Sequence, residues 1–463
     1  MVKKSFTETA YKNVDDFVYG KSIYPVTTKR GLVVGGGTLY PEVNFTLPTM
    51  LITDETMPEV LSIYKEIITG IAQRAVELEV EGFSAECEWL PGMTFEPERG
   101  IQVMRILEDV VEEYYQKYGI KGAVRSTPVD IREGKGVDHM WHGAAWDKVV
   151  RSFEGSAEIG NDFLSIESIG GKDVHDEGLM YCDIEKVIFG VGVLGAKDME
   201  VLWEMIAKVA GKYPGVTAAG DTACGFANTA MVLAEQGYIP RVLGATARVI
   251  AAVRTMVANE QGATGPDKDC GYEGVIIKAI TGMPVTMEGR MAAVAHLSRV
   301  GNIALCCADL WSNESIQHIK LLGGYAEVVS VEQLAYDCRL LNCARERDEK
   351  TALLMRDLLA NSDSWRDPHA YILRPDVALK IATAIVSEKD DHYLRSVKAA
   401  ATALAVIREG YDKKELKLED RELSYLDSLS ETVAAMPKDE GSFIEQQVAA
   451  NTNPKFDPKM YDL

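Results

Sequence analysis

The stretch GVTAAGDTACGFAN, residues 215–228, shows the structural unit that recurs along this chain. Small and apolar residues from Gly215 to Asp221 predict a buried strand, and a loop that contains glycine and cysteine follows it directly. A helix is predicted before the strand, because apolar residues recur there at helical spacing: Met199, Leu202, Ile206 and Val209. Alternating helices and strands of this kind are typical of a parallel α/β fold.

Similar units lie on both sides of this stretch. Short strands are predicted at Gly122–Ser126 and Asp162–Ser168, and a long amphipathic helix is predicted at Ile239–Val257. The units extend over about 270 residues, which suits a TIM (β/α)8 barrel, although an open doubly wound sheet has the same rhythm. We therefore predict three parts: a loop-rich N-terminal segment (1–75), a TIM barrel (76–345) and a helical C-terminal region (346–463).

The composition disfavours several classes of function. The 463 residues include 49 Lys and Arg against 70 Asp and Glu, which gives a formal charge of −21. So acidic a chain is not expected to bind nucleic acid or an anionic membrane. No apolar run reaches the roughly 20 residues of a membrane span, and the N-terminus lacks the apolar part of a secretory signal. The eight cysteines form no CxxC pair, so we expect a cytoplasmic protein.

Two cysteines flanked by glycine and one glutamate stand out as candidate metal ligands. Cys224 follows the strand that ends at Asp221, Cys270 lies in the loop GPDKDCGYEG, and Glu167 closes the strand DFLSIES. Strand ends of this kind meet at the mouth of a barrel. Two thiolates and a carboxylate would bind zinc and leave its fourth position open. Buried free cysteines and a salt-bridged glutamate are the alternative interpretation.

Two other patterns are weaker signals of a metal or cofactor. His139 and His142, in DHMWHG, could bind a metal, but histidines beside a tryptophan are as easily structural. Residues 173–178, DVHDEG, match the DxHxxG pattern by which corrinoid-carrying domains offer a histidine to cobalt. The Gly-Gly pair that should follow at a fixed distance is missing, so a chance match is the better interpretation.

At these residues the sequence resembles the zinc-containing methanol:corrinoid methyltransferase subunits of methylotrophic anaerobes. The resemblance extends over nearly the whole chain and is strongest in six stretches: LSIESIGGK (164–172), TAAGDTACGFANTAM (217–231), GPDKDCGYEGVIIKAITGMPVTMEG (265–289), DLWSNES (309–315), LAYDC (334–338) and RDPHAY (366–371).

The resemblance implies a fold, a cofactor and partners. It implies a TIM barrel with a helical extension and one Zn²⁺ per chain, bound by Glu167, Cys224 and Cys270. It also implies transfer of the methyl group of methanol to Co(I) of a separate corrinoid protein, in one-carbon metabolism such as methanogenesis or acetogenesis. A homodimer with one corrinoid protein on each copy is expected.

Some questions stay open at this stage. Glu86, Glu88 and Asp221 are candidates for supplying a proton to the departing oxygen, because each is placed near a strand end. The methyl donor could instead be a methoxylated or methylthio compound. A non-catalytic corrinoid-binding module is a further alternative. Because Co(I) must be shielded from water, we expect the mouth of the barrel to be partly apolar.

Overall fold

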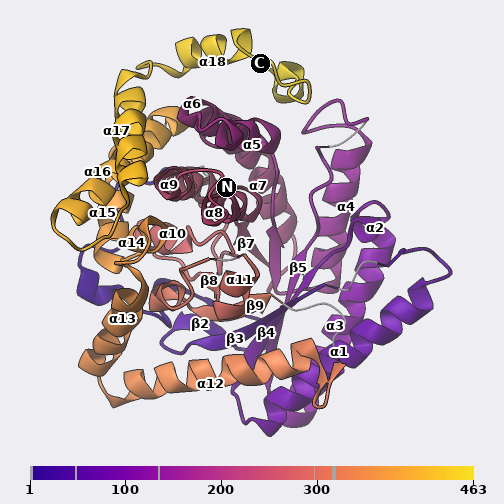
Figure 1. Cartoon of the computed structure of the whole chain (residues 1–463). Coiled ribbons are helices and arrows are strands. Elements are labelled where there is room, and N and C mark those ends of the chain that lie inside the picture. The colour runs from indigo at the N-terminus through magenta and orange to yellow at the C-terminus, as the bar shows by residue number, and fades with distance from the viewer. Residues whose placement is uncertain are drawn as a thin grey trace.

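The computed structural model describes residues 4–46, 50–133, 136–268, 270–296, 298–314, 320–389 and 391–463. Within these ranges seven parallel strands form a curled sheet with helices around it (Figure 1). The strands, in their order across the sheet, are β7 (Thr217–Asp221), β6 (Phe163–Ile166), β5 (Lys121–Thr127), β4 (Gly82–Glu88), β3 (Tyr40–Phe45), β9 (Leu310–Glu314) and β8 (Thr286–Glu288).

The remaining strands form two small hairpins: β1 (Lys21–Thr27) with β2 (Val33–Gly36), and β10 (Lys320–Leu321) with β11 (Gly324–Tyr325). The helices of the first half are α1 (Met57–Glu77), α2 (Pro91–Thr94), α3 (Pro97–Tyr118), α4 (Ala144–Ile159), α5 (Lys172–Met180), α6 (Ile184–Val187), α7 (Ala196–Ala210) and α8 (Thr229–Glu235). Those of the second half are α9 (Arg241–Glu260), α10 (Gly274–Thr281), α11 (Arg290–Ala295), α12 (Ala326–Arg347), α13 (Glu349–Asp363), α14 (Pro368–Tyr371), α15 (Pro375–Ile385), α16 (His392–Asp412), α17 (Asp420–Ala435) and α18 (Glu440–Ala449).

Residues 264–267 occupy the eighth strand position and close the barrel. On one side, the backbone N–H groups of Thr264 and Gly265 donate to carbonyls of β7, each at 2.9 Å. On the other side, Asp267 forms a parallel bridge with Val285, and Thr286 of β8 donates to its carbonyl at 2.7 Å. Pro266 has no N–H to donate, so this segment cannot form a regular ladder. The predicted TIM barrel is confirmed, with one irregular strand.

The interior of the barrel is polar at its centre. The guanidinium of Arg125, on β5, donates to Glu42 at 3.1 Å, to Ser165 at 2.7 Å and to the carbonyl of Pro266 at 2.8 Å. It also donates to Thr286 at 2.9 Å. Branched aliphatic residues usually fill this space in TIM barrels. Here one buried cation joins β3, β6, the 264–267 segment and β8.

An apolar cluster closes the N-terminal end of the barrel. Leu32 and Val34, from the β1–β2 hairpin, pack with residues at the starts of the sheet strands: Tyr40, Ala123, Phe163, Ala219 and Leu310. Burial of such side chains stabilises the fold by about 25 cal/mol for each Å² removed from water. Because this end is closed by apolar side chains, we look for the candidate site at the opposite end, where the strands terminate.

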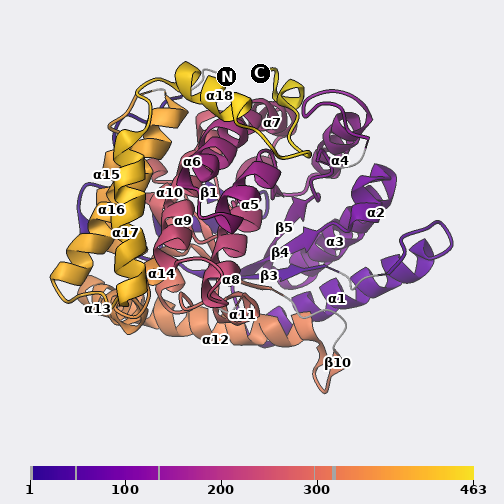
Figure 2. The ribbon, with the colours of Figure 1, turned by 45° about the horizontal axis from the view of Figure 1, so that its top comes forward.

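The predicted helices form where the apolar spacing indicates. Helix α3 ends at Tyr118, and Gly119 takes the left-handed conformation (φ 73°) that ends a helix without strain. Helix α9 is long and apolar enough by composition to cross a membrane, but its residues from Val242 to Glu260 are all buried inside the protein. Beyond residue 346 the chain is helical, and α15, α16 and α17 pack side by side along one edge of the molecule (Figure 2).

The N-terminal boundary differs from the one that we drew at residue 75. Strand β3 lies inside the segment 1–75, yet it pairs with β4 and β9 in the middle of the sheet. Helix α1 also begins in that segment. Strand β3 is buried on both faces but contains a proline and two polar residues, so it lacks the continuous apolar run that marks a buried parallel strand. The barrel sheet thus begins at Tyr40.

Candidate functional site

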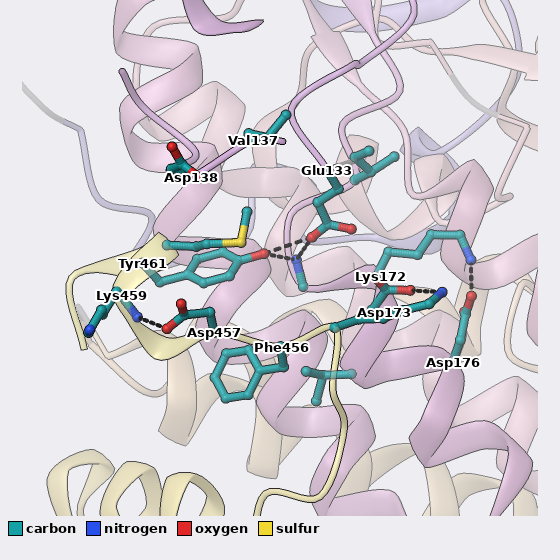
Figure 3. A pocket seen from close by; sticks show the side chains of 15 residues that line it. Glu133, Val137, Asp138, Lys172, Asp173, Asp176, Phe456, Asp457, Lys459 and Tyr461 are labelled. Carbon is teal, nitrogen blue, oxygen red and sulfur yellow. Dashed lines mark hydrogen bonds and ion pairs between the residues drawn. The ribbon is translucent and has the colours of Figure 1, made fainter. Parts of the chain in front are cut away.

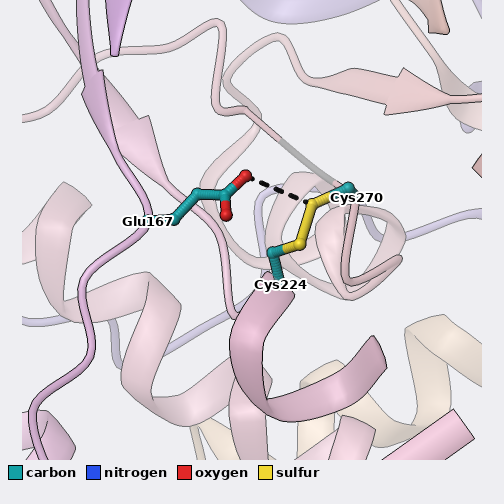
Figure 4. Close-up of side chains that lie close together, drawn as sticks. All are labelled: Glu167, Cys224 and Cys270. Atoms are coloured by element: carbon teal, nitrogen blue, oxygen red, sulfur yellow. Dashed lines mark hydrogen bonds between the residues drawn. A yellow bond between two sulfur atoms is a disulfide. The ribbon is translucent and has the colours of Figure 1, made fainter. Parts of the chain in front are cut away.

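Glu167, Cys224 and Cys270 converge at the mouth of the barrel (Figure 4). Glu167 follows β6, Cys224 begins a π-helical turn after β7, and Cys270 lies between the 264–267 segment and α10. One ligand atom from each residue lies within 4.8 Å of the others, and within the described ranges this is the one such group of three. Glu167 and Cys224 are partly exposed, so the group is open on one side.

The turn after β6 is held in place by buried charges. Glu167 itself forms a parallel bridge with Val129. The next residue, Ser168, donates its backbone N–H to Asp221 Oδ1 at 3.3 Å and accepts from Arg254 through its carbonyl at 2.7 Å. These contacts fix the backbone that carries Glu167, but not the rotation of its side chain.

The two cysteine loops are joined to each other. The backbone N–H of Ala223 donates to Glu273 Oε1 at 2.6 Å, and Gly271 donates to the hydroxyl of Thr222 at 3.3 Å. A Cβ on Gly271 would lie 3.1 Å from the backbone of Ala223 and 2.5 Å from Glu273, so this close approach needs glycine. Glu273 and Thr222 therefore fix the spacing of the cysteines.

The geometry of the cysteine pair suits a shared metal ion. The structure joins Cys224 and Cys270 as a disulfide, with Cα atoms 5.3 Å apart. When reduced, the pair provides two thiolates beside Glu167, whose Oε1 lies 3.5 Å from Cys270 Sγ. Ligand atoms on one zinc lie roughly 3.5–4 Å apart, since Zn–S is about 2.3 Å and Zn–O about 2.0–2.2 Å. The Glu167–Cys270 distance falls in this range, and two thiolates with one carboxylate are a ligand set that suits zinc. Asn228 Nδ2 also donates to Cys224 Sγ at 3.1 Å.

A buried lysine that the sequence analysis did not single out lies beside this group. The Lys268 ammonium forms ion pairs with Glu167, with Glu88 at 2.9 Å and with Glu86 at 3.8 Å. Burial alone would lower the pKa of Lys268, but the carboxylates around it raise that pKa well above its ordinary value. Lys268 therefore remains charged. In the sequence, only its position two residues before Cys270 could have indicated that Lys268 lies near the candidate metal ligands.

The carboxylates at the mouth differ in their protonation. Burial raises the pKa of Glu86 to about 8, against the opposing effect of Lys268. Burial also tends to raise the pKa of Glu88, but Lys268 and Asn44 more than offset this and lower it. Burial raises the pKa of Glu167 as well. The centre of the mouth therefore contains charged groups, and the partly apolar mouth that the sequence analysis expected stays a prediction.

The three candidate proton donors lie in different surroundings. Asp221 is fully buried and accepts hydrogen bonds from Trp203 at 3.0 Å and Arg254 at 3.2 Å. Glu86 is 1% exposed and accepts from Thr127 at 2.6 Å. Glu88 is 30% exposed, so of these three it is the one with an open side.

The two histidine patterns are held by structural contacts. His139 and His142 stack at 3.9 Å, and the ring nitrogens of His139 contact Asp462 and the backbone of Trp141, each at 3.1 Å. His175, of the DxHxxG pattern, is fully buried on α5 beneath Phe226 and pairs with Asp176. In this position His175 is not open to a large cofactor.

A cavity of about 940 Å³ is lined in part by the loop that follows Glu167 (Figure 3). It lies between the start of α5 and the C-terminal segment, where Tyr461 donates its hydroxyl to Glu133 at 2.8 Å and accepts from the backbone of Gly171 at 2.7 Å. The described lining contains Ile169 and Gly171, from the loop after Glu167, but none of the three ligands. Burial raises the pKa of Glu133 to about 7.

Comparisons with known proteins agree in sequence and in structure. The sequence model of the family described as "Methanol-cobalamin methyltransferase B subunit" matches residues 3–462. The chain is 39% identical over 450 residues to a methanol–corrinoid protein co-methyltransferase of Methanosarcina barkeri (strain Fusaro / DSM 804), over 96% of each chain. It also matches a chain in the crystal structure of the methanol:cobalamin methyltransferase complex MtaBC from Methanosarcina barkeri. That match has a TM-score of 0.93 and 37% identity, and it covers 99% of this chain and 100% of that chain.

Proposed function

The chain belongs to the family of methanol-cobalamin methyltransferase B subunits, and on that premise we propose that it transfers the methyl group of methanol to the cobalt of a corrinoid carried by a separate protein. The observation that carries this proposal is the convergence of Glu167, Cys224 and Cys270 at the mouth of the barrel. These residues would hold one zinc ion per chain and leave one position open for the substrate oxygen.

The donor set suits this reaction. Methanol is a poor methyl donor, because hydroxide is a poor leaving group. A bound zinc ion would supply Lewis acidity at the methanol oxygen. Two thiolates and a carboxylate carry three negative charges, one more than zinc neutralises. Methanol would therefore keep its proton more readily than beside neutral ligands, which helps, because methoxide is a worse methyl donor than methanol.

The side chains around the open position would take different parts in the reaction. Methanol, a proton and the reduced cobalt together give methylcobalt and water, so the departing oxygen must keep one proton and gain another. Glu88 is partly exposed and anionic, and it would accept the hydrogen bond of the methanol hydroxyl. Asp221, with no open side, would act as a positioning residue through Ser168.

The experiment combines metal analysis with methyl transfer. The reduced, full-length chain should contain about one zinc per chain and should methylate a reduced corrinoid protein when methanol is added. A methoxylated aromatic compound and a methylthio compound are the alternative donors to assay in parallel. Failure to bind zinc, or faster transfer from another donor, would contradict the proposal. A coloured protein as purified would favour the corrinoid-carrier alternative.

Assembly and location complete the proposal. We infer a cytoplasmic homodimer with one corrinoid protein on each copy, because two-fold association is the commonest closed symmetry. The methanol:cobalamin methyltransferase complex MtaBC contains a chain similar to this one, which supports a corrinoid protein as partner. Light scattering during size-exclusion chromatography, with and without the corrinoid protein, measures both associations. A monomer at micromolar concentration would exclude the dimer.

A further inference from the structure

Lys268 occupies a fixed place in the barrel wall. It follows directly after the 264–267 segment, whose Pro266 carbonyl accepts from Arg125 and whose Asp267 pairs with β8. The side chain of Lys268 is 1% exposed. A long, flexible side chain is thus held by its backbone and directed to one point at the mouth.

The ammonium is shared among groups from two other strand ends. It contacts Glu167 after β6, and Glu88 and Glu86 on β4. Its nitrogen also lies 3.9 Å from Cys270 Sγ. A buried charge is stable only with charged or polar partners, and these partners include two of the three candidate metal ligands.

The contact with Glu167 determines where that carboxylate lies. Lys268 binds Oε1 of Glu167, the same oxygen that lies 3.5 Å from Cys270 Sγ. Glu88 is bound by the same ammonium. Without Lys268, the like charges of Glu88 and Glu167 would repel each other, and Glu167 could turn through its open side toward solvent.

We propose that Lys268 is a positioning residue that directs Glu167 toward the two cysteines and so makes the carboxylate a metal ligand. This inference rests on the proposed function, because it assumes that a metal binds there. Hydrogen-bonded partners of metal ligands commonly change metal affinity by about 10–100-fold. Lys268 would act through Glu167 and would not itself bind the metal.

The test uses Co²⁺ alone as the probe, in the reduced full-length chain. Absorption of bound Co²⁺ reports the ligand set, and competition with a chelator gives the affinity. Lys268→Met should weaken Co²⁺ binding at least 10-fold and shift the spectrum toward that of Glu167→Gln. Lys268→Arg, which keeps the charge, should restore most of both.

Lys278→Met is the matched control. Lys278 is an equally buried lysine, ion-paired to Asp309 at 2.8 Å at the other end of the barrel. Its replacement should lower stability without changing the Co²⁺ spectrum. Should Lys268→Met not fold, the double variant Lys268→Met/Glu88→Gln, which also removes a charge, is measured in its place.

The outcomes separate the two proposals. If the wild-type chain binds no Co²⁺ or zinc, the proposed function fails. If the wild-type chain binds Co²⁺ and the Lys268 variant has the same spectrum and affinity, the positioning role is excluded while the metal site stands. Equal spectral changes in the Lys268 and Lys278 variants would show a merely structural effect and would also overturn the inference.

Discussion

The two ends of the barrel each contain a buried lysine, and the lysines have different surroundings. At the base, Lys278 has one carboxylate, Asp309, and donates to the carbonyl of Cys307 at 2.7 Å. At the mouth, Lys268 is shared by Glu86, Glu88 and Glu167. Lys278 thus pairs its charge one to one, whereas Lys268 lies among an excess of negative charge. Such an excess is suited to binding a metal ion, whereas a balanced pair leaves no negative charge over for one.

The largest expected effect comes from removing a ligand at the mouth. Cys224→Ala should reduce bound zinc from about one per chain to almost none. Methyl transfer should fall by roughly 1,000-fold or more, since Lewis acidity contributes several kcal/mol. Elemental analysis and methanol-dependent methylation of a reduced corrinoid protein measure both. Cys307→Ala, at the base, should retain zinc and activity. Wild-type zinc content in the Cys224 variant would refute the assignment of this ligand.

The next largest effect is expected at the base. Lys278→Met leaves Asp309 buried without its cation, and breaking a buried pair from one side costs about 3–5 kcal/mol of unfolding free energy. Urea denaturation measures this loss. The double variant Lys278→Met/Asp309→Leu removes both charges and should recover part of the lost unfolding free energy. If the single variant were as stable as wild type, the contrast between the two ends would not hold.

A smaller effect is expected where the cysteine loops are joined. Glu273→Ala removes the acceptor for Ala223 and Thr255, so the spacing of the cysteines should loosen. Metal affinity should fall by about 10-fold, and stability by about 1–3 kcal/mol. Glu273→Gln keeps an acceptor oxygen and serves as the control. Chelator competition measures the metal affinity. Unchanged affinity in the alanine variant would show that the loops hold their spacing without Glu273.

The smallest effect is expected in pH dependence beside the mouth. Folding raises the pKa of Glu133 from 4.5 to about 7, so the folded state retains a proton that the unfolded state has lost. The contribution of Glu133 to stability is therefore full below pH 4.5 and falls as the pH rises to 7. Because the side chain is partly exposed, we expect about 1–2 kcal/mol. Glu133→Gln should remove this part of the pH dependence in denaturation measured at pH 5 and pH 8.

The sequence contained enough information for the fold and for the three candidate ligands. Gly119 marked the end of α3, and the apolar spacing of α7 and α9 predicted helices that the structure confirms. Local patterns suffice for α7, because such a helix buries one face along its whole length, whereas α9 has the same apolar spacing but is buried on nearly every side. Glu167, Cys224 and Cys270 were predicted as ligands from the ends of their strands and from the family resemblance. The structure brings them together, and their role as zinc ligands remains a prediction.

Other features were decided only by the tertiary structure. Residues 264–267 have no strand pattern, since Gly265 and Pro266 are poor strand formers, and they pair only because β7 and β8 leave one position between them. Lys268 depends on carboxylates of β4, about 180 residues earlier in the chain. Local sequence determines secondary structure and strand ends, but the state of a buried charge is set by distant partners, because electrostatic interactions act through space and are strong where water is excluded.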